Sequence, residues 1–462
     1  MKIIRPTAIT DSAGSFTRST TATYFDKDGI LQTAAIDMPR VTFEYDVASS
    51  RWKCMGVLIE PAATNIVLNS ATAVTQNVTT TAQTYTLSFY GTGQVAHSGT
   101  SIGTTIGTHA NVRTVVTFTA TAGTLTLTVT GSVTKWQLET GSVATSYYPT
   151  AGAIATREAD VITGTGFIYS NIAETEYAAW NPGTDYVVTP TPDRVIRTTA
   201  TTHSVYERVV PGTTATAPEL DPINWIRVGP TNRWAAFDGS PSTLSRNTEY
   251  LTYILKPGAI NSIALLELEG TEVAINLYAA GAQQYFGYTD LMNTESIGNW
   301  YEYFYEPFYY QTNLAVSDLV NASLLDLPHY GDTILCITVR KAGSTAQVGV
   351  VATGLVYELG KTQNGMSVGI IDYSRKDTDA YGNTVLIRRK FSRRIRATFF
   401  LYSSKVDVVA NLLTQYRATP VVWIGADANY SSLVVYGFYR DWDIGIPNNI
   451  GSSCSIEIEG LA

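Results

Sequence analysis

The feature that most constrains this chain is a two-residue alternation of apolar and hydroxyl-bearing side chains within residues 71–150. Tyr85, Leu87 and Phe89 alternate with Thr and Ser, and Leu or Val alternates with Thr over 124–130. Such a period places the apolar set on one face of an antiparallel strand and the hydroxyl set toward water. Glycines between these runs indicate turns. Several short strands at this spacing predict a β-sandwich.

Composition supports a β-rich protein and argues against two partner classes. Charged residues make up 15%, below the roughly 25% that is usual, whereas Thr and Tyr, which suit pleated surfaces, are abundant. The net charge of −8 argues against nonspecific nucleic-acid binding and against docking on an anionic membrane. A basic run over 388–396 is interpreted as a solvated strand edge or a subunit contact, with a polyanion site as the alternative.

The 462 residues suggest about three domains. We predict a mainly β protein with several antiparallel sandwich or jelly-roll domains, a small three-stranded module and one C-terminal helix. The predicted segments are an N-terminal attachment or assembly segment (1–70), the sandwich (71–150), a linker (151–176), the small module (177–230) and a C-terminal β part with the helix (231–462).

Two local elements are specified more closely. Asp28-Gly29 can supply the positive φ angles of a tight hairpin, and a calcium loop is the alternative, although it lacks the further oxygen ligands that such a loop needs. Near the C-terminus, apolar residues recur at helical spacing, and the serine pair 403–404 can cap that helix. The apolar positions are Val406, Val409, Ala410 and Leu413.

Cysteine usage and hydropathy bear on the compartment. Cys54, Cys336 and Cys454 are far apart, which indicates buried thiols in a reducing cytoplasm and no disulfide framework. The N-terminus has no long apolar stretch, so no signal peptide is expected. No apolar run reaches the roughly 18 residues that a membrane span requires.

No motif for catalysis stands out. The four histidines lack zinc-ligand spacing, and neither a G-x-S-x-G elbow nor a Walker loop is present. Glu267 and Glu269 would share one face of a strand, and we interpret them as a solvated face and not as a glycosidase pair. We predict that the protein is not an enzyme and has no catalytic residues, no metal and no cofactor.

Residues 15–70 resemble a segment of phage tail and virion fibre proteins, and the following sandwich resembles the carbohydrate-binding-like sandwiches of phage tail proteins. The matching residues are Phe16-Thr17-Arg18, Ala22-Thr23-Tyr24, Asp28-Gly29, Pro39-Arg40, Gly56-Val57-Leu58-Ile59-Glu60-Pro61, Thr64-Asn65, Trp136-Gln137-Leu138-Glu139 and Ser142-Val143-Ala144-Thr145-Ser146-Tyr147. The resemblance covers about the first 160 residues. It implies a virion-bound module that contacts glycans.

Two later segments carry weaker resemblances. Residues 177–228 are similar to small chitin-binding-type modules, although Pro192-Asp193 stands where those modules have Gly-Asp. This similarity implies a carbohydrate platform, because aromatic faces stack on apolar sugar faces; the alternative is that the same rings form the core of the module. The platform residues would be Trp180, Tyr186 and Trp225. Residues 232–280 resemble the start of a galactose-binding-like jelly roll, and 369–439 resemble the ends of phage structural proteins.

An aromatic cluster over 300–310 predicts an interface or ligand contact, because Tyr and Trp are enriched where a ring is buried and its polar atom is wet. The residues chosen are Trp300, Tyr301, Tyr305 and Tyr309. The alternative is that these rings pack the core of their own domain.

Together these features predict a structural component of a tailed-phage virion, in the tail, baseplate, neck or a fibre. Its expected partners are other virion proteins, copies of itself in a homotrimer or other ring, and host-surface glycans, but neither nucleic acid nor a membrane. It would be assembled in the host cytoplasm. The alternatives are a glycan-degrading tailspike, for which no β-helix repeat is evident, and a purely architectural collar or baseplate protein without a ligand.

Overall fold

The computed structural model describes residues 1–10, 14–199, 202–291, 314–317 (backbone only), 332–363, 365–378, 384–425, 433–446 and 451–461. Within these ranges the only α-helix is α2 (Val406–Gln415), and every strand pairing is antiparallel except one. The predicted mainly β class with antiparallel sheets and one C-terminal helix is confirmed. None of the described helices is long and apolar enough to cross a bilayer.

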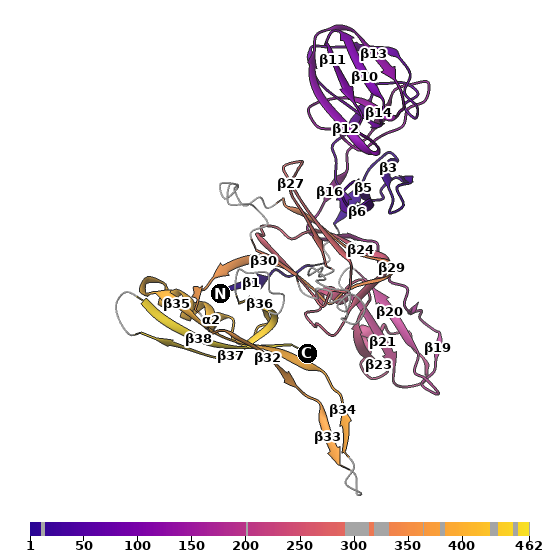
Figure 1. Ribbon diagram of the computed structural model, residues 1–462. Coiled ribbons are helices and arrows are strands. Elements are labelled where there is room, and N and C mark those ends of the chain that lie inside the picture. Colours follow the sequence, from indigo (N-terminus) through magenta and orange to yellow (C-terminus); the bar gives the residue numbers. More distant parts are fainter. Residues whose placement is uncertain are drawn as a thin grey trace.

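The Thr-rich segment forms a sandwich at one end of the molecule (Figure 1). One sheet has the order β11-β10-β13-β8 and the other β12-β9-β14. Leu87, Phe89, Leu125 and Leu127 meet in its core and are fully buried. The strands are β8 (Gln76–Thr80), β9 (Gln83–Gly91), β10 (Gln94–Gly99), β11 (Gly103–Ile106), β12 (His109–Ala120), β13 (Gly123–Thr130) and β14 (Val133–Thr140).

Strand β9 departs from the predicted pattern because both of its faces are buried. Thr86 and Ser88 were expected to face water, yet neither is exposed. The Thr86 hydroxyl donates to the Gly141 carbonyl at 2.8 Å, and the Ser88 hydroxyl accepts a hydrogen bond from Arg113 at 2.7 Å. The middle strand of this sheet is therefore covered on its outer side by the loop that follows β14.

An N-terminal unit carries the sandwich and includes strands from both sides of it in the sequence. Gly29 (φ 75°) turns the β3–β4 hairpin, as predicted. Residues 151–176 differ from the predicted linker, because β15 pairs with β7, β16 with β2, and β17 with β24. The strands are β2 (Ser15–Thr17), β3 (Ala22–Phe25), β4 (Leu31–Ala34), β5 (Arg40–Asp46), β6 (Arg51–Leu58), β7 (Ala63–Asn65), β15 (Ala155–Arg157), β16 (Val161–Thr163) and β17 (Gly166–Ser170).

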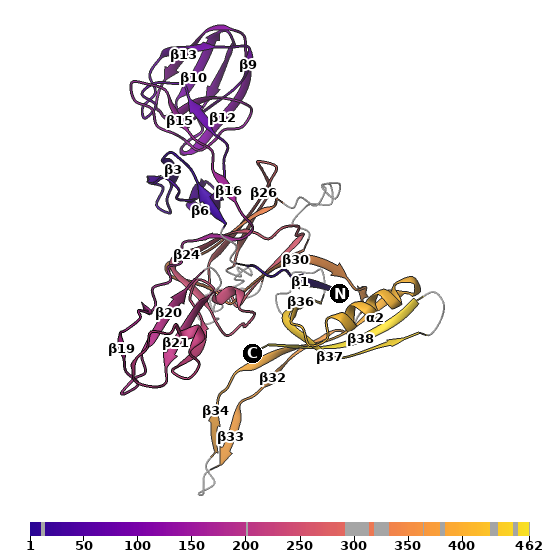
Figure 2. The same ribbon diagram turned by 180° about the vertical axis from the view of Figure 1, so that it is seen from behind.

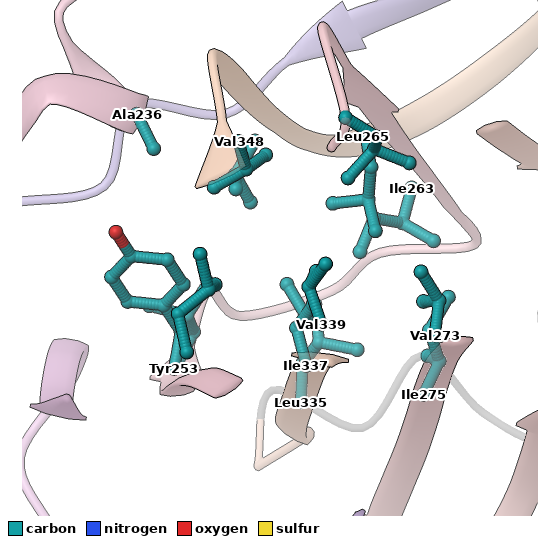
Figure 3. Packing of buried hydrophobic residues seen from close by; sticks show 14 of the residues in the cluster. Ala236, Tyr253, Ile263, Leu265, Val273, Ile275, Leu335, Ile337, Val339 and Val348 are labelled. Atoms are coloured by element: carbon teal, nitrogen blue, oxygen red, sulfur yellow. The ribbon is translucent and has the colours of Figure 1, made fainter. Parts of the chain in front are cut away.

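A central sandwich is built from a five-stranded sheet, β17-β24-β29-β26-β27, and strands β25 and β30 of a larger sheet. Figure 3 shows Ile263 and Leu265 of β25 pointing toward Ile337 and Val339 of β29. The strands are β24 (Ser245–Lys256), β25 (Ser262–Leu266), β26 (Glu272–Ala279), β27 (Ala282–Asp290), β29 (Ile334–Val348) and β30 (Val350–Glu358).

The larger sheet also contains the first strand of the chain. β1 (Lys2–Pro6) lies between β30 and β36, so the predicted 1–70 segment is divided between two parts of the molecule. Ile3 and Ile4 are fully buried on opposite faces of this sheet. Its order is β28-β25-β30-β1-β36-β37-β38-β35-β31, with β32 also beside β35.

Helix α2 covers one face of the larger sheet's C-terminal half (Figure 2). Val409 and Leu413 are buried as the spacing predicts, but the serine cap is absent, because residues 403–405 form a 3₁₀ turn. The remaining strands are β28 (Leu314–Ser317), β31 (Lys361–Thr362), β32 (Ser367–Asp372), β35 (Phe391–Tyr402), β36 (Val421–Ile424), β37 (Val434–Gly445) and β38 (Gly451–Gly460).

The small module has the three predicted strands and short additions. β20, β21 and β23 form an antiparallel sheet, and β18 adds a parallel pair at its edge. The strands are β18 (Ala178–Ala179), β19 (Asp185–Tyr186), β20 (Arg194–Thr198), β21 (His203–Arg208), β22 (Gly212–Thr213) and β23 (Trp225–Pro230).

Candidate functional site

The N-terminal unit joins the sandwich to the rest of the molecule (Figure 1), and it contains a buried ionic cluster. This cluster consists of Arg18, Arg40, Glu60, Arg157 and Asp160, and we call it the ionic joint. The side chains of the three arginines and Asp160 are fully buried, and that of Glu60 is 14% exposed. Buried charges of this kind are held only where they are paired and hydrogen-bonded.

Asp160 connects two arginines that are distant in sequence. Its Oδ1 lies 2.9 Å from Nη1 of Arg18, and its Oδ2 lies 2.8 Å from Nη2 of Arg40. The same Oδ2 accepts the backbone N–H of Glu60 at 3.0 Å. Arg40 also contacts the Glu60 carboxylate at 2.9 Å, so both acids and both arginines form one network.

Glu60 extends this network into the sandwich. Its carboxylate accepts the Ser146 backbone N–H at 2.7 Å and the Ser146 hydroxyl at 2.6 Å. Burial by itself raises the pKa of Glu60, but the positive charges of Arg40 and Arg157 and the bonds from Ser146 outweigh burial and hold that pKa below its ordinary value. The ionised Glu60 side chain therefore links the N-terminal unit to the loop after β14.

Residues from several of the sequence stretches singled out above lie together in this joint. Arg18, Arg40, Glu60 and Ser146 belong to four separate matching stretches, and all four are in the network. A fifth, Asn65, reinforces it, because its amide donates to the Tyr148 carbonyl at 2.9 Å and accepts from the Leu138 N–H at 3.2 Å. These residues therefore link the sandwich to its base through hydrogen bonds and ion pairs.

Two members of the joint were not singled out from the sequence. Arg157 donates to the Pro61 carbonyl at 2.6 Å, and Asp160 is the central acid. The available signal was the dense charge of Arg157-Glu158-Ala159-Asp160 directly after the long, weakly charged sandwich segment. Apart from a 4.0 Å contact between Arg157 and Asp160 themselves, their ionic partners lie about 100 residues or more earlier in the chain, and nothing local identifies them.

A cleft of about 580 Å³ opens beside the joint, between the N-terminal unit, the sandwich and the β26–β27 hairpin. Its lining combines aromatic rings with a few charged groups, as is usual for small-molecule sites. The charged residues are Glu44, Glu60, Arg113 and Glu139, and the aromatic ones are Tyr24, Phe25, Phe43, Tyr90, Tyr147 and Tyr278.

The two further acids of the cleft differ in their bonding. Glu139 accepts hydrogen bonds from the Gln137 amide and from the backbone N–H and hydroxyl of Thr145, at 2.7–2.9 Å, so its oxygens are occupied. The Glu44 side chain has no hydrogen bond or ion pair within the described part of the chain. Desolvation raises the pKa of Glu44, although Arg113 opposes this. Glu44 is therefore the acid that remains open to a ligand.

Two of the three residues of the predicted sugar platform are buried in the core of the small module. Trp225 is 2% exposed and Tyr186 6%, and the two rings pack edge to face at 4.9 Å. Rings so covered offer no face to a sugar, so for these two the core alternative describes the structure. Trp180 is only partly buried, and the Arg197 guanidinium lies over its ring at 5.0 Å.

The structure places the other residues discussed in the sequence analysis as follows. Trp300, Tyr301, Tyr305 and Tyr309 lie outside the described residues. Glu269 pairs with Lys341 at the surface, consistent with a solvated face. The three cysteines are free and buried. Among the described residues, no group of three or more His, Cys, Asp or Glu side chains is arranged to hold a metal.

Comparisons with known proteins add little. No protein-family model matches the chain, and no curated protein matches it. A solved structure that does match is a GH78-family rhamnosidase of Bacillus sp. GL1, with 11% identity and a TM-score of 0.19. The alignment covers 80% of this chain but only 36% of the rhamnosidase, so the chain spans little more than a third of that protein. A likeness this low carries no argument about fold or activity.

Proposed function

We propose that this chain is a structural component of a tailed-phage virion, an accessory or fibre protein of the tail, baseplate or neck. The observation that carries the proposal is the convergence of the tail-protein motif residues on the ionic joint. A motif that builds a rigid junction suits a protein whose task is to hold β-modules at fixed positions on a particle.

The arrangement of the modules supports the same role. The sandwich, the small module and the C-terminal sheet extend in different directions from the central sandwich (Figures 1 and 2). Such a layout presents several surfaces to neighbours. Interactions with other virion proteins and with copies of the chain follow from this proposal.

The test is the presence of the chain in intact particles. Phage particles purified by density gradient from cells that express the chain should contain it in a fixed copy number by quantitative mass spectrometry, and a particle reconstruction should show its density on the tail or neck. A chain that stays in the soluble lysate and is absent from washed particles would contradict the proposal.

We further propose that the cleft beside the joint binds host-surface glycan. Sugars need hydrogen-bond acceptors for their hydroxyls and apolar walls for their C–H faces, and Glu44 and the aromatic lining supply both. Binding by one copy would be weak, in the millimolar range at best, and several copies held together would raise the overall strength.

A glycan array probed with the assembled protein tests this second part. Glu44→Gln should reduce the signal about 10-fold, because the amide lacks the negative charge and has one acceptor oxygen in place of two. Glu158→Gln, at an exposed residue that does not line the cleft, should leave the signal unchanged. No signal from the assembled wild-type protein would refute glycan binding and leave the structural role intact.

Glycan cleavage is not part of the proposal. A glycosidase needs an acid that can protonate the leaving oxygen and a second carboxylate across the cleft. Glu139, although burial raises its pKa, is occupied by three hydrogen bonds. Incubation with host capsule or lipopolysaccharide should therefore release no new reducing ends.

A further inference from the structure

A slender β-arm projects from the C-terminal sheet, well away from the cleft and the joint (Figures 1 and 2). We define the arm as residues 367–396, of which all but 379–383 are described. It begins with β32 paired to the first half of β35 and continues as an isolated ribbon of β33 (Arg375–Thr378) and β34 (Thr384–Ile387). In the described part of the chain, this ribbon pairs only with itself.

The arm exposes several apolar side chains to solvent, which is unfavourable for an isolated two-stranded ribbon. Six of them are at least 42% exposed, and Leu386 reaches 76%. An isolated two-stranded ribbon is marginally stable in water, and an apolar edge strand tends to pair with another chain. The six are Val368, Ile370, Val385, Leu386, Ile387 and Phe391. The arm therefore needs a covering partner.

The charge of the arm indicates which partner covers it. Residues 367–396 contain eight Lys or Arg and three Asp, a net charge of +5. Since the whole chain carries −8, the remaining residues carry −13. Within the described ranges, the side chains of Lys376, Arg389 and Lys390 form no ion pair. The acidic remainder of another copy would complement these cations.

We propose that the arm docks on a neighbouring copy of this chain and so links the copies head to tail. The contact joins two different surfaces, the basic and apolar arm of one copy and the acidic body of the next, and a contact of this type closes into a ring when its rotation permits. The inference rests on the proposed function in one respect, since it names the surface through which the virion component would assemble.

Sedimentation velocity of the full chain tests the contact. Wild type should self-associate with rising concentration, and Leu386→Asp should weaken the association at least 10-fold. Ile102→Asp, which changes an even more exposed apolar residue on the sandwich, is the matched control and should leave it unchanged. Because the Leu386 side chain is largely in solvent, the folded monomer should keep its circular dichroism spectrum in the variant.

A charge reversal separates this contact from a polyanion site. Arg389→Glu combined with Lys390→Glu should also weaken self-association at least 10-fold, as should added salt. A wild-type chain that remains monomeric at every concentration overturns the inference, as does association that Leu386→Asp leaves intact. Binding of heparin or duplex DNA by monomers that do not associate would assign the arm to a polyanion instead.

The outcomes also distinguish this inference from the proposed function. Particles that incorporate the Leu386→Asp chain in normal copy number and symmetry would overturn the arm contact and leave the virion role standing. If the chain self-associates through the arm but never enters particles, the arm contact would stand and the proposed virion role would fail.

Discussion

Asp160 bridges two arginines of the ionic joint, because one of its oxygens pairs with Arg18 and the other with Arg40. In Asp160→Asn the shape is kept, but the buried guanidinium of Arg18 loses its compensating charge, and that of Arg40 keeps only the charge of Glu60. Breaking a buried pair in this way costs about 3–5 kcal/mol. We expect local opening to become at least about 100-fold more frequent.

Amide hydrogen exchange measures that opening directly. The N–H of Glu60 bonds to Asp160 and that of Ser146 bonds to Glu60, so both should exchange faster in the variant. The control is Asp185→Asn, at an exposed position of the small module, which should change stability by less than about 0.5 kcal/mol. Unaltered exchange at residues 60 and 146 would show that the joint does not depend on this charge.

The joint should also be sensitive to acid through Glu60. Its pKa is lower in the folded protein than the ordinary value of 4.5, so its stabilising contribution is present above that value and is lost as pH falls through the folded pKa. Calorimetry from pH 7 to 3 should show the transition of the sandwich and its base moving to lower temperature below about pH 4.5. Glu60→Gln should be less stable at neutral pH and should lack this part of the pH dependence.

Three of the five residues of the joint, Arg18, Arg40 and Glu60, stand in the matching stretches, although none was predicted as a site residue. Arg157 and Asp160 had no motif to mark them. The reason is physical, because ion pairs such as Arg18–Asp160, 142 residues apart, are set by tertiary packing and not by any local period. The cleft was missed for the same reason, since its walls come from three parts of the molecule, the N-terminal unit, the sandwich and the β26–β27 hairpin.

Among the elements, β1 ties the start of the chain to its distant C-terminal sheet. It can lie beside β30 only because Gly354 has no side chain, since a Cβ there would meet the Arg5 carbonyl oxygen at 1.8 Å. Gly354→Ala should therefore destabilise this sheet by about 1–3 kcal/mol or more. The measurement is hydrogen exchange across β1, together with the calorimetric transition of the C-terminal part.

Gly152→Ala provides the matched comparison, because a Cβ at that position meets nothing within 4 Å. Its effect should stay within about 0.5 kcal/mol. Equal stability of the two alanine variants would mean that β1 does not pack against β30 as closely as described.

Elements with a strong internal period were predictable, and those fixed by partners were not. The period-two run of β13 and the helical spacing of α2 both reappear in the structure. The sequence did not predict that β1 belongs to the C-terminal sheet, nor which strands pair with β15, β16 and β17. Each of these pairings depends on a partner strand tens to hundreds of residues away. Strand existence is a local property, whereas sheet membership is not.

At the scale of the whole molecule, the ionic joint stabilises contacts within one copy, whereas the arm offers surface for contacts between copies. The joint fixes one module against its base through buried charges, while the arm leaves apolar surface uncovered for a neighbour. A chain built this way should be rigid within each copy and gain its final stability by association.

Small-angle scattering tests the rigid part of this description on the whole chain. A compact globule of this length would have a radius of gyration of about 23 Å, and the spread of modules in Figure 1 requires a clearly larger value for the monomer. Leu386→Asp would supply that monomer. Adding Arg40→Met and Phe25→Ala should broaden the distance distribution, because the first removes the contact with Glu60 and the second the ring packing of Phe25 on Tyr90 at 5.2 Å. If both monomers scatter alike, the sandwich is held by something other than the joint and this ring contact, and the proposed rigid junction fails.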